Sequence, residues 1–298
     1  MKKTRELIVA HLKLVDVVVE VCDARIPASS RNPIIGELIA GKTHVLVLNK
    51  NDLAGAEATK AWIGFFREHG THAIALNAMS GQGTKPLIAK LEQIAAKKAA
   101  AGTSKAKLPL RLMVVGIPNS GKSSLINRLV GKRATQVGDR PGVTRGKQWL
   151  TLENGMQLLD TPGILWPKFE DPQVGLNLAF CGSIRDEIMD VAELALELVQ
   201  VLMREHAEAL EERYGITISA SSRALTADLS LSPPTKSREA SVLAGNKEEA
   251  LAVMEEIARK RGYILPGKRI DYERTARALL DEFRSGKMGR ISLELPGN

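Results

Sequence analysis

The stretch GIPNSGKSS at residues 116–124 constrains the fold more strongly than any other part of this sequence. An apolar run (110–116) leads into it, and a helical pattern, SSLINRLV (123–130), leads out of it. The spacing G-x-x-x-x-G-K-[ST] is met by Gly116, Gly121, Lys122 and Ser123. In such a loop, backbone N–H groups and a helix N-terminus surround phosphate groups, and the lysine reaches them. The motif therefore predicts a strand, a phosphate-binding loop and a helix in succession.

This loop supplies most of the candidate ligand-binding residues. We expect contacts with a nucleoside triphosphate from Asn119, Ser120, Gly121, Lys122, Ser123 and Ser124. The Ser123 hydroxyl is placed to bind Mg²⁺. A glycine-rich turn without function would have to match four specified residues in this strand-to-helix setting, so we favour the functional interpretation.

Two later segments carry residues that can sense the outermost phosphate. The sequence LLDTPG (158–163) ends a strand pattern at Asp160, whose carboxylate can hold the Mg²⁺ shell through water, and its Gly163 amide can contact the γ-phosphate. The segment RPGVTRG (140–146) offers Thr144 as a second hydroxyl for Mg²⁺. Threonine is common in surface loops and DTPG alone is often a turn, so both assignments depend on the phosphate loop upstream.

A second strand pattern, HVLVLNK (44–50), ends in residues suited to reading a purine base. Asp52 can accept two hydrogen bonds from guanine N1–H and the exocyclic amine, which adenine does not present in that arrangement. We expect Asn49 to brace the loop and the Lys50 stem to cover the ring. Such a tetrapeptide alone could be a turn, but the next strand ends in LNAMSG (76–81), whose alanine amide could contact the guanine oxygen. The candidate base-binding residues are Asn49, Lys50, Asp52, Asn77 and Ala78.

The base-reading loop precedes the phosphate loop, whereas Ras-like chains have the opposite order. Strand and helix patterns alternate through residue 163, which predicts a parallel sheet with helices on both faces. Ligand loops in such sheets project from the carboxyl ends of the strands, whatever their order along the chain. A circular permutation joined at about residues 97–109 reconciles both motifs. The sequence thus predicts an α/β fold, with a circularly permuted P-loop G domain at residues 1–168.

Beyond that domain the patterns are helical, which predicts a small all-helical domain at residues 169–298. Ser183 and Asp186 resemble a capping box that opens an amphipathic helix. We interpret the polar, proline-containing segment 215–245 as a loop, with helical patterns resuming from about residue 247.

Composition limits the compartment and the partners. Hydrophobic residues make up 44% of the 298 residues and charged residues 26%, which excludes a mostly disordered chain. No apolar run approaches a membrane span, and the isolated Cys22 and Cys181 support neither a disulfide framework nor a zinc site, so we expect a cytoplasmic protein without a membrane partner. The net charge is +8, and residues 258–290 carry ten Lys or Arg against four Asp or Glu. Such segregation favours a polyanionic partner.

Together these motifs resemble the circularly permuted GTPases of the YlqF/RbgA family, bacterial assembly factors of the large ribosomal subunit. The likeness covers nearly the whole chain and includes DARIPASSRNP (23–33), GDRPGVT (138–144), LLDTPGILWPKFED (158–171) and KMGRISLE (287–294). The resemblance implies hydrolysis of GTP to GDP and phosphate with Mg²⁺, slow alone and stimulated by the ribosomal particle. It also implies that the helical domain binds rRNA of a large-subunit precursor; no DNA partner is expected.

Two positions bear on catalysis, and one family element has no match. Ile164 stands where Ras-like enzymes have Gln and cannot orient a water, so we expect intrinsic turnover of roughly 10⁻⁴ to 10⁻³ s⁻¹ or less. Asn119 matches a residue that holds K⁺ in place of an arginine finger in GTPases of this type, unless it only ties the loop to a switch. The family has an aromatic-Pro-Gly-His-Met segment whose histidine is proposed to act in catalysis, and this sequence starts at what resembles its final Met. The histidine is absent through truncation, a wrongly assigned start or genuine loss, and His11, a helix length further on, is not its equivalent. No catalytic group is assigned.

Three functions remain open at this stage. The first is a GTP-hydrolysing switch that binds rRNA in the GTP state, and the second is a GTP-clamped RNA-binding scaffold with negligible hydrolysis. The third, an ATPase, is disfavoured by Asp52. The candidate RNA-contacting cations are Arg259, Lys260, Arg261, Lys268, Arg269, Arg274, Arg277, Lys287 and Arg290. We expect roughly half of them to cover a helix face in water instead, and the aromatic content of 4% disfavours base stacking.

Overall fold

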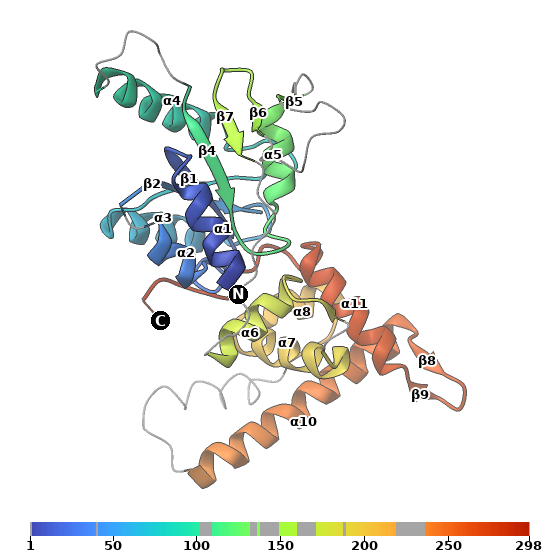
Figure 1. Cartoon of the computed structure of the whole chain (residues 1–298). Helices are drawn as coiled ribbons and strands as arrows, with labels where there is room; N and C mark the ends of the chain where they lie inside the picture. Colours follow the sequence, from blue (N-terminus) through green and yellow to red (C-terminus); the bar gives the residue numbers. More distant parts are fainter. Residues whose placement is uncertain are drawn as a thin grey trace. The chain divides into compact units, whose positions relative to one another are not determined.

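The structure, a computed structural model, describes residues 2–39, 41–101, 109–131, 136–137, 149–159, 171–186, 189–218 and 236–297. The chain divides into two compact units (Figure 1). Residues 1–175 and 292–298 form the first, and residues 176–291 form the second. The sequence predicted that 292–298 belong with the helical domain, whereas the structure returns them to the first unit. No described helix is long and apolar enough to cross a membrane.

A seven-stranded sheet organises the described part of the first unit, in the order β3-β2-β1-β4-β7-β6-β5. Its strands are β1 (Val17–Asp23), β2 (Thr43–Asn49), β3 (His72–Ala75), β4 (Arg111–Val115), β5 (Gln136–Val137), β6 (Trp149–Thr151) and β7 (Gln157–Leu159). The strands from β3 to β7 in this order run parallel. The base-loop strand β2 and the phosphate-loop strand β4 therefore end at the same edge, with only β1 between them. This order confirms the predicted permutation.

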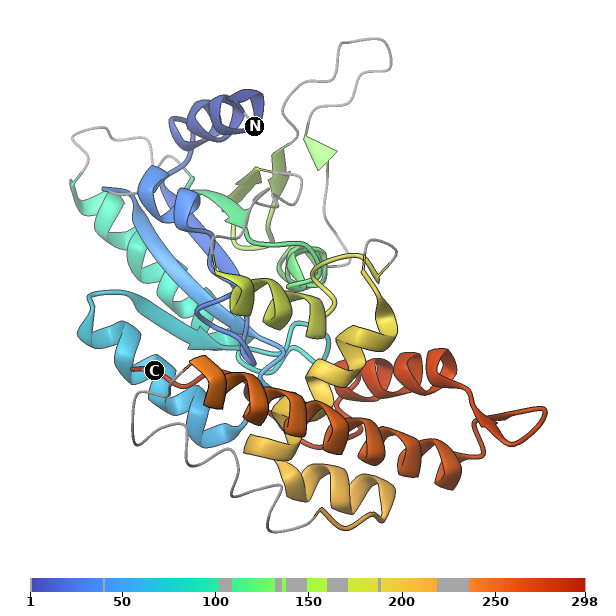
Figure 2. The same ribbon diagram turned by 90° about the horizontal axis from the view of Figure 1, so that it is seen from below.

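Helices cover both faces of the sheet, as Figures 1 and 2 show. On one face lie α4 (Thr84–Ala101) and α5 (Lys122–Val130), on the other α1 (Lys2–Leu12), α2 (Pro33–Leu38) and α3 (Ala56–Glu68). In α4 the apolar side chains of Leu87 and Leu91 are buried, at 0% and 1% exposure. Because both faces are covered, β1 and β2 can be apolar without alternation.

The sheet is not parallel throughout. The strands β6 and β7 pair antiparallel, as do β5 and β6. Only residues 152–156 separate β6 from β7, and a parallel connection needs a crossover of roughly a dozen residues or more. The expectation of a parallel sheet is therefore wrong at this edge and correct for the strands that carry the loops.

The described residues of the second unit are helical apart from one short hairpin. Its described elements are α6 (Pro172–Phe180, entering from the first unit), α7 (Val191–Glu205), α8 (Ala207–Tyr214), α10 (Lys236–Arg261), β8 (Ile264–Leu265), β9 (Arg269–Ile270) and α11 (Tyr272–Arg284). The helix α7 packs against α10 and α11. The carboxylate of Glu282 accepts hydrogen bonds from Arg213 (2.7 and 2.8 Å), Tyr214 (2.9 Å) and Arg261 (3.3 Å), which ties α8, α10 and α11 together.

Two predictions for this unit are wrong. The helix α7 begins at Val191 and is capped by Asp190, which accepts from the amides of Ala192 and Glu193, so Ser183 and Asp186 do not open it. Asp186 instead binds the Arg284 guanidinium through two hydrogen bonds of 2.8 Å, which hold the pKa of its carboxyl below the usual value. The segment interpreted as a loop contains the start of α10 at residue 236, while residues 219–235 lie outside the described residues.

Candidate functional site

The phosphate loop, between β4 and α5, needs backbone conformations that glycine favours. Gly116, Asn119 and Gly121 have φ angles of +150°, +56° and +91°. A Cβ atom at Gly121 would lie under 3.0 Å from Asn49 Nδ2, and one at Gly116 would also lie under 3.0 Å from the Val21 carbonyl oxygen. Real Cβ atoms do not come so close. Both motif glycines are therefore required by packing as well as by backbone angle.

Asn49 joins the base loop to the phosphate loop. Its Nδ2 donates to the Ser120 carbonyl oxygen at 2.7 Å, and its Oδ1 accepts from the Ala78 amide at 2.9 Å. The side chain is only 3% exposed. Asn49 thus joins its own loop to two others, through partners that lie 71 and 29 positions away from it in the sequence. These two hydrogen bonds are what a bracing residue would make, and they bring the two motifs together at one edge of the sheet.

Lys50 is held by the end of β1. Its backbone has a positive φ of +59°, and its Nζ lies 3.0 Å from the buried carboxylate of Asp23. Arg25 binds the same carboxylate from Nε (3.0 Å) and Nη2 (2.8 Å). Burial opposes ionisation, but the charges of Arg25 and Lys50 hold the pKa of Asp23 well below its usual range. This ion cluster positions Lys50 beside Asp52, whose own side chain is exposed.

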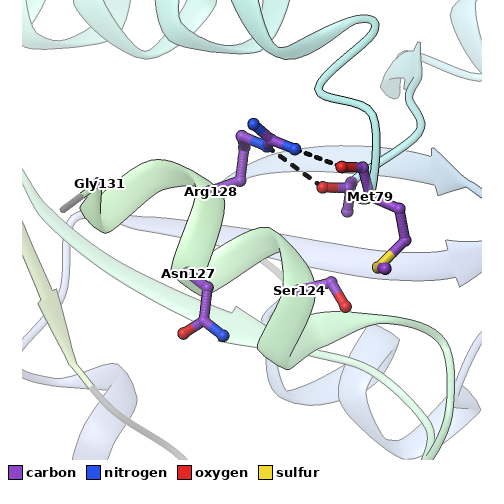
Figure 3. A pocket seen from close by; sticks show the side chains of 6 residues that line it. Met79, Ser124, Asn127, Arg128 and Gly131 are labelled. Carbon is purple, nitrogen blue, oxygen red and sulfur yellow. Dashed lines mark hydrogen bonds between the residues drawn. The ribbon is translucent and has the colours of Figure 1, made fainter.

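The loop after β3 is fastened in two ways. The Asn77 Oδ1 accepts from the amides of Met79 (2.9 Å) and Ser80 (3.0 Å). From α5, Arg128 donates to the Ala78 carbonyl oxygen through Nε (3.3 Å) and to the Met79 carbonyl oxygen through Nη2 (Figure 3). The candidate base-contact residue Ala78 is thereby locked to the helix that follows the phosphate loop.

An open cavity of about 530 Å³ lies between this loop and α5. Its lining is formed by Ala78, Met79, Ser124, Asn127, Arg128 and Gly131 (Figure 3). The lining combines Ala78, predicted to contact the base, with Ser124, predicted to lie near the phosphates. The cavity is large enough for part of a nucleotide.

The start of α5 presents groups suited to an anion. Gly121 at the N-cap makes no side-chain cap, so the first amides of the helix are left for another acceptor. The Lys122 Nζ donates to the Ile117 carbonyl oxygen at 2.5 Å, and burial lowers the pKa of Lys122 to about 8. The exposed Ser123 follows in the first turn.

Several predicted residues lie outside the described residues, and others were missed. Thr144, Asp160, Gly163 and Ile164 belong to the first group, so their roles stay predictions. Asp23, Arg25 and Arg128 were missed as parts of the site. An acidic residue ending a fully buried strand was the available signal for Asp23; nothing local distinguished Arg128 from other basic residues on helices.

The fold and the site define a P-loop GTPase domain in which the base loop precedes the phosphate loop. A family model described as 50S ribosome-binding GTPase matches residues 111–222. The chain is 40% identical to ribosome biogenesis GTPase A of Bacillus cereus, covering 99% of this chain and 92% of that protein, and 32% identical to the protein of that name from Thermotoga maritima, covering 99% and 92%. It is also 32% identical to mitochondrial ribosome-associated GTPase 1 of Bos taurus, covering 96% and 83%.

A solved structure agrees with these relatives. The crystal structure of GNP-bound YlqF from T. maritima is similar over 99% of both chains, with a TM-score of 0.62 and 29% identity. The GDP-bound form of that protein gives the same TM-score. The chain belongs to the ribosome biogenesis GTPase A (YlqF) family.

Proposed function

We propose that this protein binds GTP across the phosphate and base loops, hydrolyses it to GDP and phosphate, and acts as a switch in assembly of the large ribosomal subunit. The observation that carries the proposal is the Asn49 bridge, because it holds the two loops close enough for one nucleotide to span them. The names of the relatives support the reaction and the ribosomal role. The buried thiols of Cys22 and Cys181 are not joined in a disulfide, which suits a reducing cytoplasm.

The proposed pose follows the two loops. The guanine edge bonds to Asp52, Lys50 covers the ring, and Asn77 and Ala78 border the base. The phosphates lie against the residues from Asn119 to Ser124, where the helix N-terminus and Lys122 stabilise negative charge. Gly163 and Thr144 would contact the γ-phosphate end.

The residues present fit a hard cation beside the phosphates. The Ser123 hydroxyl, exposed in the first turn of α5, is the oxygen donor that Mg²⁺ prefers. With Thr144 and Asp160 it would hold Mg²⁺, which screens the phosphate charge when bound. Asn119, held at a positive φ in the same loop, is the residue we propose for K⁺.

RNA contacts are proposed for only part of the basic set. Arg259 pairs with Glu255 (2.6 Å) and Arg277 with Glu273 (2.9 Å), each one turn away on its own helix. Arg261 binds the buried Glu282, and Arg274 lies over the Tyr263 ring at 4.6 Å. The exposed cations that we propose to meet rRNA phosphates are Lys268, Arg269 and Lys287. Such contacts weaken steeply with salt.

The proposal is tested by co-sedimentation with large ribosomal subunits and by GTP turnover with and without them. We expect more protein to pellet with GTP than with GDP, and turnover to rise with subunits and with KCl over NaCl. Equal pelleting in both nucleotides would contradict the switch. Binding of GTP with unstimulated, negligible turnover would favour the scaffold instead, and equal turnover in KCl and NaCl would dismiss K⁺.

GDP affinity should depend on pH through Lys122. Burial sets the pKa of Lys122 at about 8 in the free protein, and bound phosphates would raise it, so binding above that pH takes up a proton. Affinity is therefore complete below pH 8 and should fall by up to about tenfold per pH unit above it. The check is calorimetric titration with GDP between pH 7 and 9. Lys122→Arg stays charged throughout this range and should remove most of the slope; an identical slope in both proteins would contradict the assignment.

A further inference from the structure

Residues 292–297, here called the return segment, lie beside α3 in the first unit (Figures 1 and 2). The Leu293 amide donates to the Arg25 carbonyl oxygen at 2.9 Å. The Ser292 Oγ accepts from the Gly55 amide at 3.0 Å, and the Glu294 carbonyl oxygen accepts from Trp62 Nε1 at 3.0 Å. Three consecutive residues thus bond to three points that are far from them in sequence.

The Glu294 side chain adds a fourth attachment. Its carboxylate accepts from the amides of Ala28 (2.6 Å) and Ser29 (3.0 Å) and from the Ser29 hydroxyl. Ser29 and Trp62 are each only 4% exposed. Hydrogen bonds to a charged acceptor are stronger than neutral ones. The return segment is therefore held at several points, two of them on the buried residues Ser29 and Trp62.

These attachment points flank the proposed guanine-reading loop on both sides. Gly55 directly follows the loop that carries Asp52, and it is the N-cap of α3. Arg25 makes the ion cluster with Asp23 that holds Lys50. The return segment binds the backbone at both places, and none of its residues belongs to the phosphate loop.

We propose that the return segment positions the guanine-reading loop, with Ser292 and Glu294 as positioning residues for the base and not for the phosphates. This inference rests on the proposed function, because it assigns the base to Asp52 and Lys50. It makes guanine affinity depend on residues more than 230 positions away from that loop in the chain. The inference also predicts that loss of these two side chains weakens binding of the base and leaves binding of the phosphates unchanged.

The test uses the full chain carrying Ser292→Ala and Glu294→Ala together. Because Gly55 loses its bond to Ser292, and the return segment loses its carboxylate attachment to Ala28 and Ser29, we expect the GDP dissociation constant to rise by about tenfold. The pyrophosphate dissociation constant should stay unchanged within about twofold. Both are measured by calorimetry. The matched control is Leu295→Ala, in the same segment but 52% exposed, which should bind both ligands as the unchanged protein does. Replacing Glu294→Ala by Glu294→Gln in the double variant keeps one acceptor oxygen and should recover part of the lost GDP affinity.

Equal GDP affinity in the double variant and the unchanged protein would overturn the inference, and so would equal losses for GDP and pyrophosphate, because that pattern indicates general destabilisation. If the double variant loses its cooperative thermal transition, Ser292→Ala alone is judged by the same pair of ligands. If the unchanged protein bound no GDP, the proposed function itself would be contradicted. Failure of the inference and failure of the proposed function are therefore distinguishable.

Discussion

Gly121→Ala should abolish tight nucleotide binding, with GDP affinity falling by about 100-fold or more. The new Cβ atom would lie under 3.0 Å from Asn49 Nδ2, so the Asn49 amide must move away. That movement breaks the bonds to the Ser120 carbonyl oxygen and the Ala78 amide together, and it leaves buried polar groups unpaired, at about 1–3 kcal/mol each. Since 1.4 kcal/mol corresponds to about tenfold, two such losses reach the expected size.

Gly155→Ala is the matched control for this change. Gly155 also has a positive φ, +79°, but a Cβ atom there would meet nothing within 4 Å. Both variants incur the backbone strain of alanine at positive φ, of order 1–2 kcal/mol, and both should lower the melting temperature. Only Gly121→Ala should lose GDP, as measured by calorimetry on folded protein. Similar GDP affinity in the two variants would show that Asn49 does not couple the loops.

The loops were predictable because their determinants are local. A phosphate loop needs two glycines at a strand-to-helix turn, and the positive φ angles of Gly116 and Gly121 match that need. Asn49 was predicted to brace its loop because it ends a buried apolar strand. The circular permutation followed in turn, since two loops that serve one ligand must lie at one edge of the sheet.

What could not be predicted depends on side chains that meet across long sequence separations. Ser183 and Asp186 have the spacing of a capping box, yet Asp186 is used by Arg284, 98 positions later. In sequence, the return segment resembles a continuation of the basic region at residues 258–290. No local pattern indicates that Glu294 accepts hydrogen bonds from Ala28 and Ser29. Local spacing identifies which groups can bond, whereas the tertiary fold decides which partner is near.

Asp52→Asn should exchange guanine for xanthine nucleotides. A carboxylate accepts from both N1–H and the exocyclic amine of guanine, whereas an amide offers one acceptor and one donor. Xanthine has an oxygen where guanine has the amine, so it complements the amide. We expect GDP affinity to fall by roughly 100-fold and the xanthine diphosphate to bind more tightly than GDP, as hydrogen bonds to a charged group contribute about 1.5–3 kcal/mol each. Competition binding with both nucleotides measures the exchange.

The position of Asp52 makes this variant interpretable. Its side chain is exposed in the structure, so the substitution should alter the free energy of unfolding by no more than about 0.5 kcal/mol. Asp281→Asn makes the same chemical change at another exposed aspartate, remote in sequence from both loops, and should leave nucleotide preference as it was. If Asp52→Asn retained its preference for GDP, the base would have to be read by another group. The loop that Asn49 joins to the phosphate loop would then not bind the base. That result would contradict the proposed pose and leave the fold assignment unaffected.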